Sequence, residues 1–115
     1  MESLIEEYVT HIVAMDNTDY GNKMSVVQHN KHANRIRKIA TNIAQKHPEL
    51  KEQFFLLIKN TNSSVRIWAA HHILEVMNYN EDEQEKALDI IKQKAQEDSV
   101  EGRGNQMWLK NWQKS

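Results

Sequence analysis

The amino-acid sequence predicts an all-α protein with a single domain, residues 1–115. Three glycines and one proline are too few for the many turns of a β-sheet protein. Apolar residues recur at spacings of three and four along most of the chain, which is the period of an amphipathic helix. Short polar segments interrupt this period, so we expect about six helices around one core.

The first two helices are expected on either side of a polar turn. Leu4, Tyr8 and Ile12 form one apolar stripe, which predicts the first helix. The segment DNTDYGNK ends this helix, with Gly21 as the expected turn residue. A longer second helix is predicted from about Ser25 to Lys46, with its apolar residues on one side.

A proline and a polar connection predict the third and fourth helices. Pro48 suits the first turn of a helix, where a backbone amide has no partner, and Phe54 and Ile58 lie on the apolar face that follows. The connection NTNSS then offers Asn62 or Ser63 as the N-cap of the fourth helix, because a side-chain oxygen there accepts hydrogen bonds from free amides.

Two more helices are expected in the last third of the chain. Asn80 is the expected N-cap of the fifth, with Glu83 at the spacing of a capping box. The sixth carries Trp108 inward and is expected to begin after Gly102 and Gly104, because a glycine costs about 1 kcal/mol inside a helix. Alternatively, the two glycines let two backbones approach closely.

The fourth helix, SSVRIWAAHHILEVM at residues 63–77, is predicted to be the centre of the molecule. Apolar residues cover most of its circumference, as in a helix packed between neighbours. Ala69 and Ala70 allow close helix–helix approach. His71 and His72 point about 100° apart, so we expect one ring to be buried and hydrogen-bonded and the other to line a surface.

The composition indicates an ordinary soluble protein without disulfides. Hydrophobic residues make up 39% of the chain and charged residues 27%, and there is no cysteine. The segment 1–16 lacks the positive region and the apolar run of a signal peptide. A stretch of about 18 apolar residues is also absent, so we expect a cytoplasmic protein.

The net charge of −1 is unevenly distributed along the chain. Residues 1–19 carry −5, residues 20–66 carry +7 and residues 67–115 carry −3. A basic middle between acidic ends predicts either an anionic partner or attraction between neighbouring helices of the same chain.

Within the basic middle, one group of residues is the candidate binding surface. Lys31, Arg35 and Lys38 fall on one side of the second helix, and His32 adjoins them. An acidic protein is the expected partner. Nucleic acid is the alternative, although no aromatic residues interleave with these charges and the isoelectric point is near 6.6.

The histidines and serines do not predict a catalytic or metal site. His29 and His32 have the spacing to face one ion, but a zinc site needs a third or fourth ligand and the nearest acids lie beyond the helix. The motif GxSxG and the phosphate-binding glycine motifs are absent. We therefore expect no catalytic residue, no metal and no cofactor.

The segment LLIKNTNSSVRIWAAHHIL resembles a HEAT-repeat unit, in which one helix leads through a polar turn into the pattern VR..AA..L. This pattern is carried here by Val65, Arg66, Ala69, Ala70 and Leu74. Over nearly the full chain, the sequence resembles a family of short HEAT-like, armadillo-like bacterial proteins of unknown function. The shared features are ANRI at 33–36, SVRIWAAHHIL at 64–74, and a terminal Leu109 and Trp112. The last unit departs from the pattern, with Asn105 and Gln106 in place of small apolar residues.

The resemblance implies an α-α superhelix of three antiparallel helix pairs that binds other macromolecules. It also implies that Arg66 reaches back to polar groups near a turn. Asn34, if buried, is expected to bond free backbone groups of a neighbouring turn or helix end. The residues with expected structural roles are Asn34, Arg66, Trp68, Ala69, Ala70 and Trp112.

These observations favour a non-enzymatic helical-repeat module that binds another protein. Related helical-repeat proteins include immunity proteins that neutralise bacterial toxins, so an immunity or regulatory role is expected by analogy of fold. The alternative is a nucleic-acid-binding protein that uses the basic second helix. An enzyme with a site assembled from scattered residues is a third hypothesis.

Overall fold

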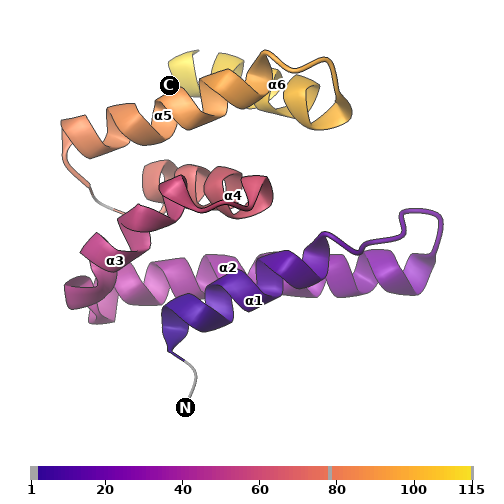
Figure 1. Ribbon diagram of the computed structural model, residues 1–115, viewed down its shortest axis with the longest axis horizontal. Helices are drawn as coiled ribbons and strands as arrows, with labels where there is room; N and C mark the ends of the chain where they lie inside the picture. Colours follow the sequence, from indigo (N-terminus) through magenta and orange to yellow (C-terminus); the bar gives the residue numbers. More distant parts are fainter. Residues whose placement is uncertain (1–2, 78, 115) are drawn as a thin grey trace.

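The computed structural model describes residues 3–77 and 79–114, with the backbone alone at 113 and 114. Over these residues the chain is helical and contains no strand, so the predicted fold class is confirmed. Six α-helices follow one another in three stacked pairs (Figure 1). They are α1 (Leu4–Met15), α2 (Lys23–Lys46), α3 (Lys51–Phe55), α4 (Ser63–Glu75), α5 (Glu81–Ala95) and α6 (Val100–Lys114).

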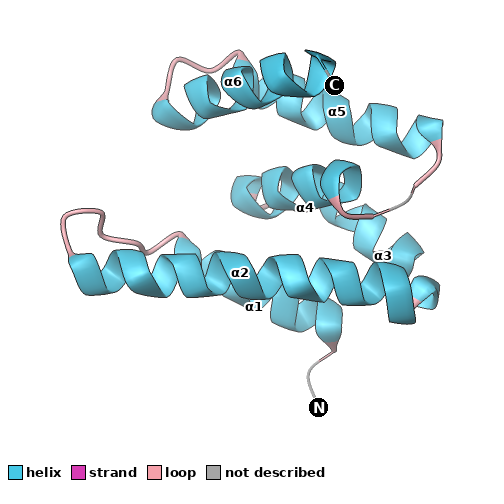
Figure 2. Ribbon diagram, turned by 180° about the vertical axis from the view of Figure 1, so that it is seen from behind, coloured by secondary structure: helices cyan, strands magenta, loops and turns pink. Residues whose placement is uncertain are grey.

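Helices α1 and α2 pack antiparallel at one end of the stack. Glu7 contacts Arg35 and His11 contacts His32, so residue numbers rise along α1 as they fall along α2. Figure 2 shows α2 as the long helix at this end, with α1 behind it. Their apolar faces meet in the core through Ile5, Tyr8 and Ile12 from α1 and Ile36, Ile39 and Ile43 from α2.

The segment that begins at Pro48 is helical, as predicted, but consists of three short pieces. A 3-10 turn over Pro48–Leu50 precedes α3, and a second over Leu56–Lys59 follows it. Phe54 and Ile58 are buried on the apolar face that the sequence indicated. This segment therefore serves as the short partner of α4 in the middle layer.

Helix α4 is the central helix. Its side chains at Val65, Ala69, Ala70 and Ile73 have no exposed surface, and the helix contacts both α1 and α5. Asn62 is the N-cap, and its side-chain oxygen accepts from the amides of the second and third residues of the helix. Small alanines on this surface let the neighbouring helices approach, which is why the middle of the stack is closely packed.

The predicted start of the sixth helix is wrong, and the close-approach alternative holds at Gly102. Helix α6 begins at Val100, before both glycines, and the Ser99 hydroxyl accepts from the Gly102 amide at 3.0 Å. A Cβ atom at Gly102 would lie 2.1 Å from the carbonyl oxygen of Glu97, whereas one at Gly104 would meet nothing within 4 Å. The turn between α5 and α6 thus requires glycine at the first position and not at the second.

Candidate functional site

A groove of about 730 Å³ lies between the end of α1 with the loop after it, α4 and α6. Three elements from the first, second and third layers of the stack therefore share one concave surface. The residues that line it are Met15, Asp16, Thr18, Tyr20, His29, Ser63, Ser64, Ile67, Trp68, His71, Glu75, Lys94, Glu101, Gly104, Asn105 and Trp108.

Hydrogen bonds hold one end of the groove in place. The Ser64 hydroxyl donates to Oδ1 of Asp16 at 2.6 Å, and the side-chain amide of Asn62 donates through Nδ2 to Oδ2 of the same carboxylate at 3.3 Å. These bonds join the start of α4 to the residue that directly follows α1. Both donors are neutral, so neither of them offsets the charge of the Asp16 carboxylate.

A histidine and an asparagine join the middle of the groove to α6. Asn105 donates through Nδ2 to the carbonyl of Glu101 at 2.7 Å, which leaves its Oδ1 as an acceptor. Nε2 of His71 lies 2.7 Å from that oxygen and therefore donates to it. The other ring nitrogen faces a carboxylate oxygen of Glu75 at 4.0 Å. Burial lowers the pKa of His71, so its ring is neutral near pH 7.

Aromatic side chains form the remainder of this wall. The rings of His71 and Trp108 are nearly perpendicular at a centroid distance of 4.6 Å, and Trp108 stacks on Trp112 at 5.1 Å with the planes 11° apart. Trp68 lines the groove from α4, and Tyr20 lines it from the loop after α1. The groove is therefore an aromatic surface with a hydrogen-bonded polar frame.

Two of the four residues expected to form a basic binding surface have partners within the chain, and two are exposed. Arg35 binds Glu7 of α1 through two nitrogens, at 2.9 and 2.8 Å, and this contact lowers the pKa of Glu7. Nδ1 of His32 lies 2.7 Å from Nδ1 of His11. Lys31 and Lys38 are exposed. Part of the basic middle is thus used for attraction between neighbouring helices.

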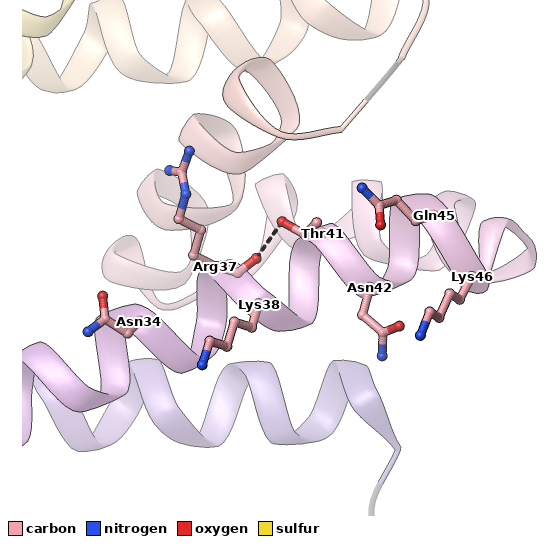
Figure 3. A pocket seen from close by; sticks show the side chains of 7 residues that line it. All are labelled: Asn34, Arg37, Lys38, Thr41, Asn42, Gln45 and Lys46. Carbon is pink, nitrogen blue, oxygen red and sulfur yellow. Dashed lines mark hydrogen bonds between the residues drawn. The ribbon is translucent and has the colours of Figure 1, made fainter.

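Lys38 instead belongs to a shallow hollow of about 490 Å³ along the open side of α2 (Figure 3). The expectation for Asn34 is corrected here, because its side chain is exposed at the edge of this hollow, off the buried face of α2. The hollow is lined by Asn34, Arg37, Lys38, Thr41, Asn42, Gln45 and Lys46.

The other residues with expected structural roles lie as follows. Nη1 of Arg66 donates to the carbonyls of Asn60 and Thr61, at 2.7 and 3.2 Å, and so reaches back to the turn before its own helix. Ala69 and Ala70 are fully buried. Trp68 packs against the core from α4.

The histidines at the expected metal spacing have separate partners. Nδ1 of His29 lies 2.8 Å from the Thr18 hydroxyl, whereas His32 contacts His11. Burial, together with the nearby rings of His11 and His29, lowers the pKa of His32. Within residues 3–77 and 79–114, no three His, Asp or Glu side chains lie close enough together to hold a metal ion.

Comparison with protein-family models, curated proteins and solved structures finds no match to this chain. In the part of the chain that the structure describes, no helix has the length and apolar character needed to cross a bilayer.

Sequence reasoning did not identify the groove, although one signal pointed to it. Asn105 stands where a repeat unit is expected to have a small apolar residue, and in the structure it is buried and bonded to His71. A polar residue at a predicted core position needs a buried partner, and that partner lies 34 positions away along the chain.

Proposed function

We propose that the protein is a non-enzymatic binding module and that the groove between α1, α4 and α6 takes a segment of another protein. The observation that carries the proposal is the groove itself, with Trp68, Trp108 and Tyr20 on its walls. Aromatic side chains in a preformed hollow are typical of the residues that dominate protein–protein binding energy. The polar residues between them are already hydrogen-bonded, so the groove needs little rearrangement to bind.

The contacts in the groove favour binding over chemistry. The Ser64 hydroxyl donates to a carboxylate and not to a histidine, and Nε2 of His71 is engaged by an amide. Nucleophilic catalysis by serine typically uses a hydroxyl that donates to a histidine or an amine as the general base. The resemblance to HEAT-like repeat proteins adds to this proposal, which includes a cytoplasmic location and a role as a regulatory or immunity partner.

The proposal is tested by filling the groove. A Cβ at Gly104 meets nothing within 4 Å and Gly104 lines the groove, so Gly104→Trp is the substitution chosen to fill it. Met107→Trp is the matched control, because Met107 is 69% exposed on the same helix and does not line the groove. Affinity capture from nuclease-treated lysate of the native host should recover a protein with wild type and Met107→Trp and lose it with Gly104→Trp. A partner retained by Gly104→Trp contradicts the proposal.

A second candidate function rests on the hollow along α2. Arg37, Lys38 and Lys46 surround side-chain amides there, and such a surface suits phosphate groups of a nucleic acid. Binding of this kind weakens steeply with salt. Lys38→Glu with Lys46→Glu should abolish retention of fluorescent duplex DNA in a low-salt filter assay, and Glu49→Lys should not. Unchanged retention by the double variant excludes this function.

A further inference from the structure

The groove carries more negative than positive charge. Asp16 contributes a carboxylate from the C-cap of α1, and Glu75 and Glu101 contribute carboxylates from α4 and α6. Among the described residues that line it, the one lysine or arginine is Lys94, whose Nζ is already paired with Glu97 at 2.7 Å. A partner that enters this groove therefore meets an uncompensated negative potential.

Among the described residues, no histidine ring of the groove lies closer than 4.0 Å to one of these carboxylates. His71 is neutral, since burial disfavours its charged form, and it lies 4.0 Å from Glu75. His29 faces the groove from α2 and is hydrogen-bonded to Thr18, which is a neutral side chain. The carboxylates thus dominate the electrostatics of the groove near pH 7.

The aromatic wall, like the carboxylates, favours a positively charged partner. Trp68 and Trp108 line the groove together with the carboxylates, and Ile67 adds apolar surface to it. The face of an indole attracts a guanidinium or an ammonium group, most strongly where water is partly excluded. The long methylene stems of arginine and lysine also cover apolar surface while the charged head reaches a carboxylate.

We propose that the groove binds an arginine- or lysine-bearing segment of a partner protein, with the cationic heads on Glu75, Glu101 and Asp16 and their stems along the indoles of Trp68 and Trp108. This inference rests on the proposed function and adds the chemistry of the partner. The charge of the groove disfavours nucleic acid and acidic segments, which its carboxylates repel.

The test uses a random peptide library displayed on phage and selected against the full chain. Peptides retained by wild type and lost with Gly104→Trp are then synthesised, and their affinity is measured by fluorescence anisotropy. The charge-neutral variant Glu75→Gln with Glu101→Gln removes two groove carboxylates. Its matched control is Glu52→Gln with Glu85→Gln, which removes two exposed carboxylates outside the groove.

Support requires three results together. The retained peptides are enriched in arginine or lysine. The affinity of the groove variant for these peptides is roughly tenfold lower, and the control variant binds them as wild type does. Added salt should also weaken binding, because the attraction is electrostatic.

The other outcomes separate the two proposals. Peptides that require an open groove but carry no basic residues, or bind the Glu75→Gln, Glu101→Gln variant unchanged, overturn the cationic partner and leave the proposed function in place. A library that yields no peptide specific for the open groove overturns both. If the chain associates with itself, and Gly104→Trp and Lys38→Glu each abolish this association, the occupant of the groove is a second copy of the chain. That result also overturns a separate partner protein.

Discussion

The hydroxyl of Tyr8 lies 2.6 Å from Nδ1 of His72 and joins the first helix to the central one inside the core. Tyr8 is fully buried and His72 is 2% exposed. Burial raises the pKa of Tyr8 far above its usual value, so the hydroxyl keeps its proton and donates it. Nδ1 of His72 is therefore the acceptor, and the other ring nitrogen carries the hydrogen in the neutral ring.

Removal of the Tyr8 hydroxyl should destabilise the protein. Tyr8→Phe keeps the ring, which meets Phe54 edge-on at 4.8 Å, but leaves the buried Nδ1 of His72 without its donor. We expect the free energy of unfolding to fall by about 1–3 kcal/mol, measured by urea denaturation. Tyr20→Phe is the control, because Tyr20 is 73% exposed. Equal stability of the two variants would show that the buried bond contributes nothing.

The stability of the protein should fall as the pH is lowered below 6.5. Burial, with smaller effects of Arg37 and His71, lowers the pKa of His72 from 6.5 to about 3. The unfolded chain therefore binds this proton more readily than the folded protein. Between pH 6.5 and about 3 the loss from His72 alone is about 1.4 kcal/mol per pH unit, and above pH 6.5 its contribution is constant.

This pH dependence is best measured between pH 7 and about 5, before most carboxylates titrate. Urea denaturation of His72→Leu should show a smaller loss of unfolding free energy per pH unit across that range than wild type shows. His47→Gln is the control, because the side chain of His47 is 42% exposed. His32 and His71 also have lowered pKa values, so a residual slope is expected in His72→Leu. A slope identical to that of wild type would contradict a neutral, buried His72.

Replacing each of the two glycines of α6 by alanine should change the stability of the protein in opposite directions. In Gly102→Ala, the added Cβ meets the carbonyl oxygen of Glu97, a backbone atom, so we expect a loss of about 1–3 kcal/mol. In Gly104→Ala the methyl group has open space, and the higher helix propensity of alanine should stabilise the protein by about 0.5–1 kcal/mol. Thermal denaturation of the pair measures both effects. Equal melting temperatures would exclude the close approach at Gly102.

A charge in the central helix should prevent folding. Ala69→Glu or Ala70→Glu buries a carboxylate without a cation, which costs several kcal/mol in a domain whose total stability is about 5–15 kcal/mol. The helical circular dichroism signal should be lost at 25 °C or melt far below that of wild type. Leu56→Glu, at a position 56% exposed, should melt close to wild type. If all three variants melt alike, α4 is not central.

Local features of the chain were predictable because local hydrogen bonds produce them. Asn80 caps α5 as the sequence indicated, and Asn62 caps α4, for which the sequence offered Asn62 or Ser63; each side-chain oxygen accepts from amides two or three residues ahead. A cap of the same kind at Asn22 begins α2 at Lys23, two residues before the expected start. The apolar spacing likewise placed Phe54 and Ile58 in the core.

The sequence by itself determined an all-α chain with a central fourth helix, because helical period, capping and small residues act over a few positions. Tertiary structure alone decided that His72 bonds to Tyr8 and His71 to Asn105. It also decided that Arg35 pairs with Glu7 and that three helices enclose a groove. These contacts join residues 28 to 64 positions apart. No local preference specifies such pairs, since they depend on how whole helices stack around one core.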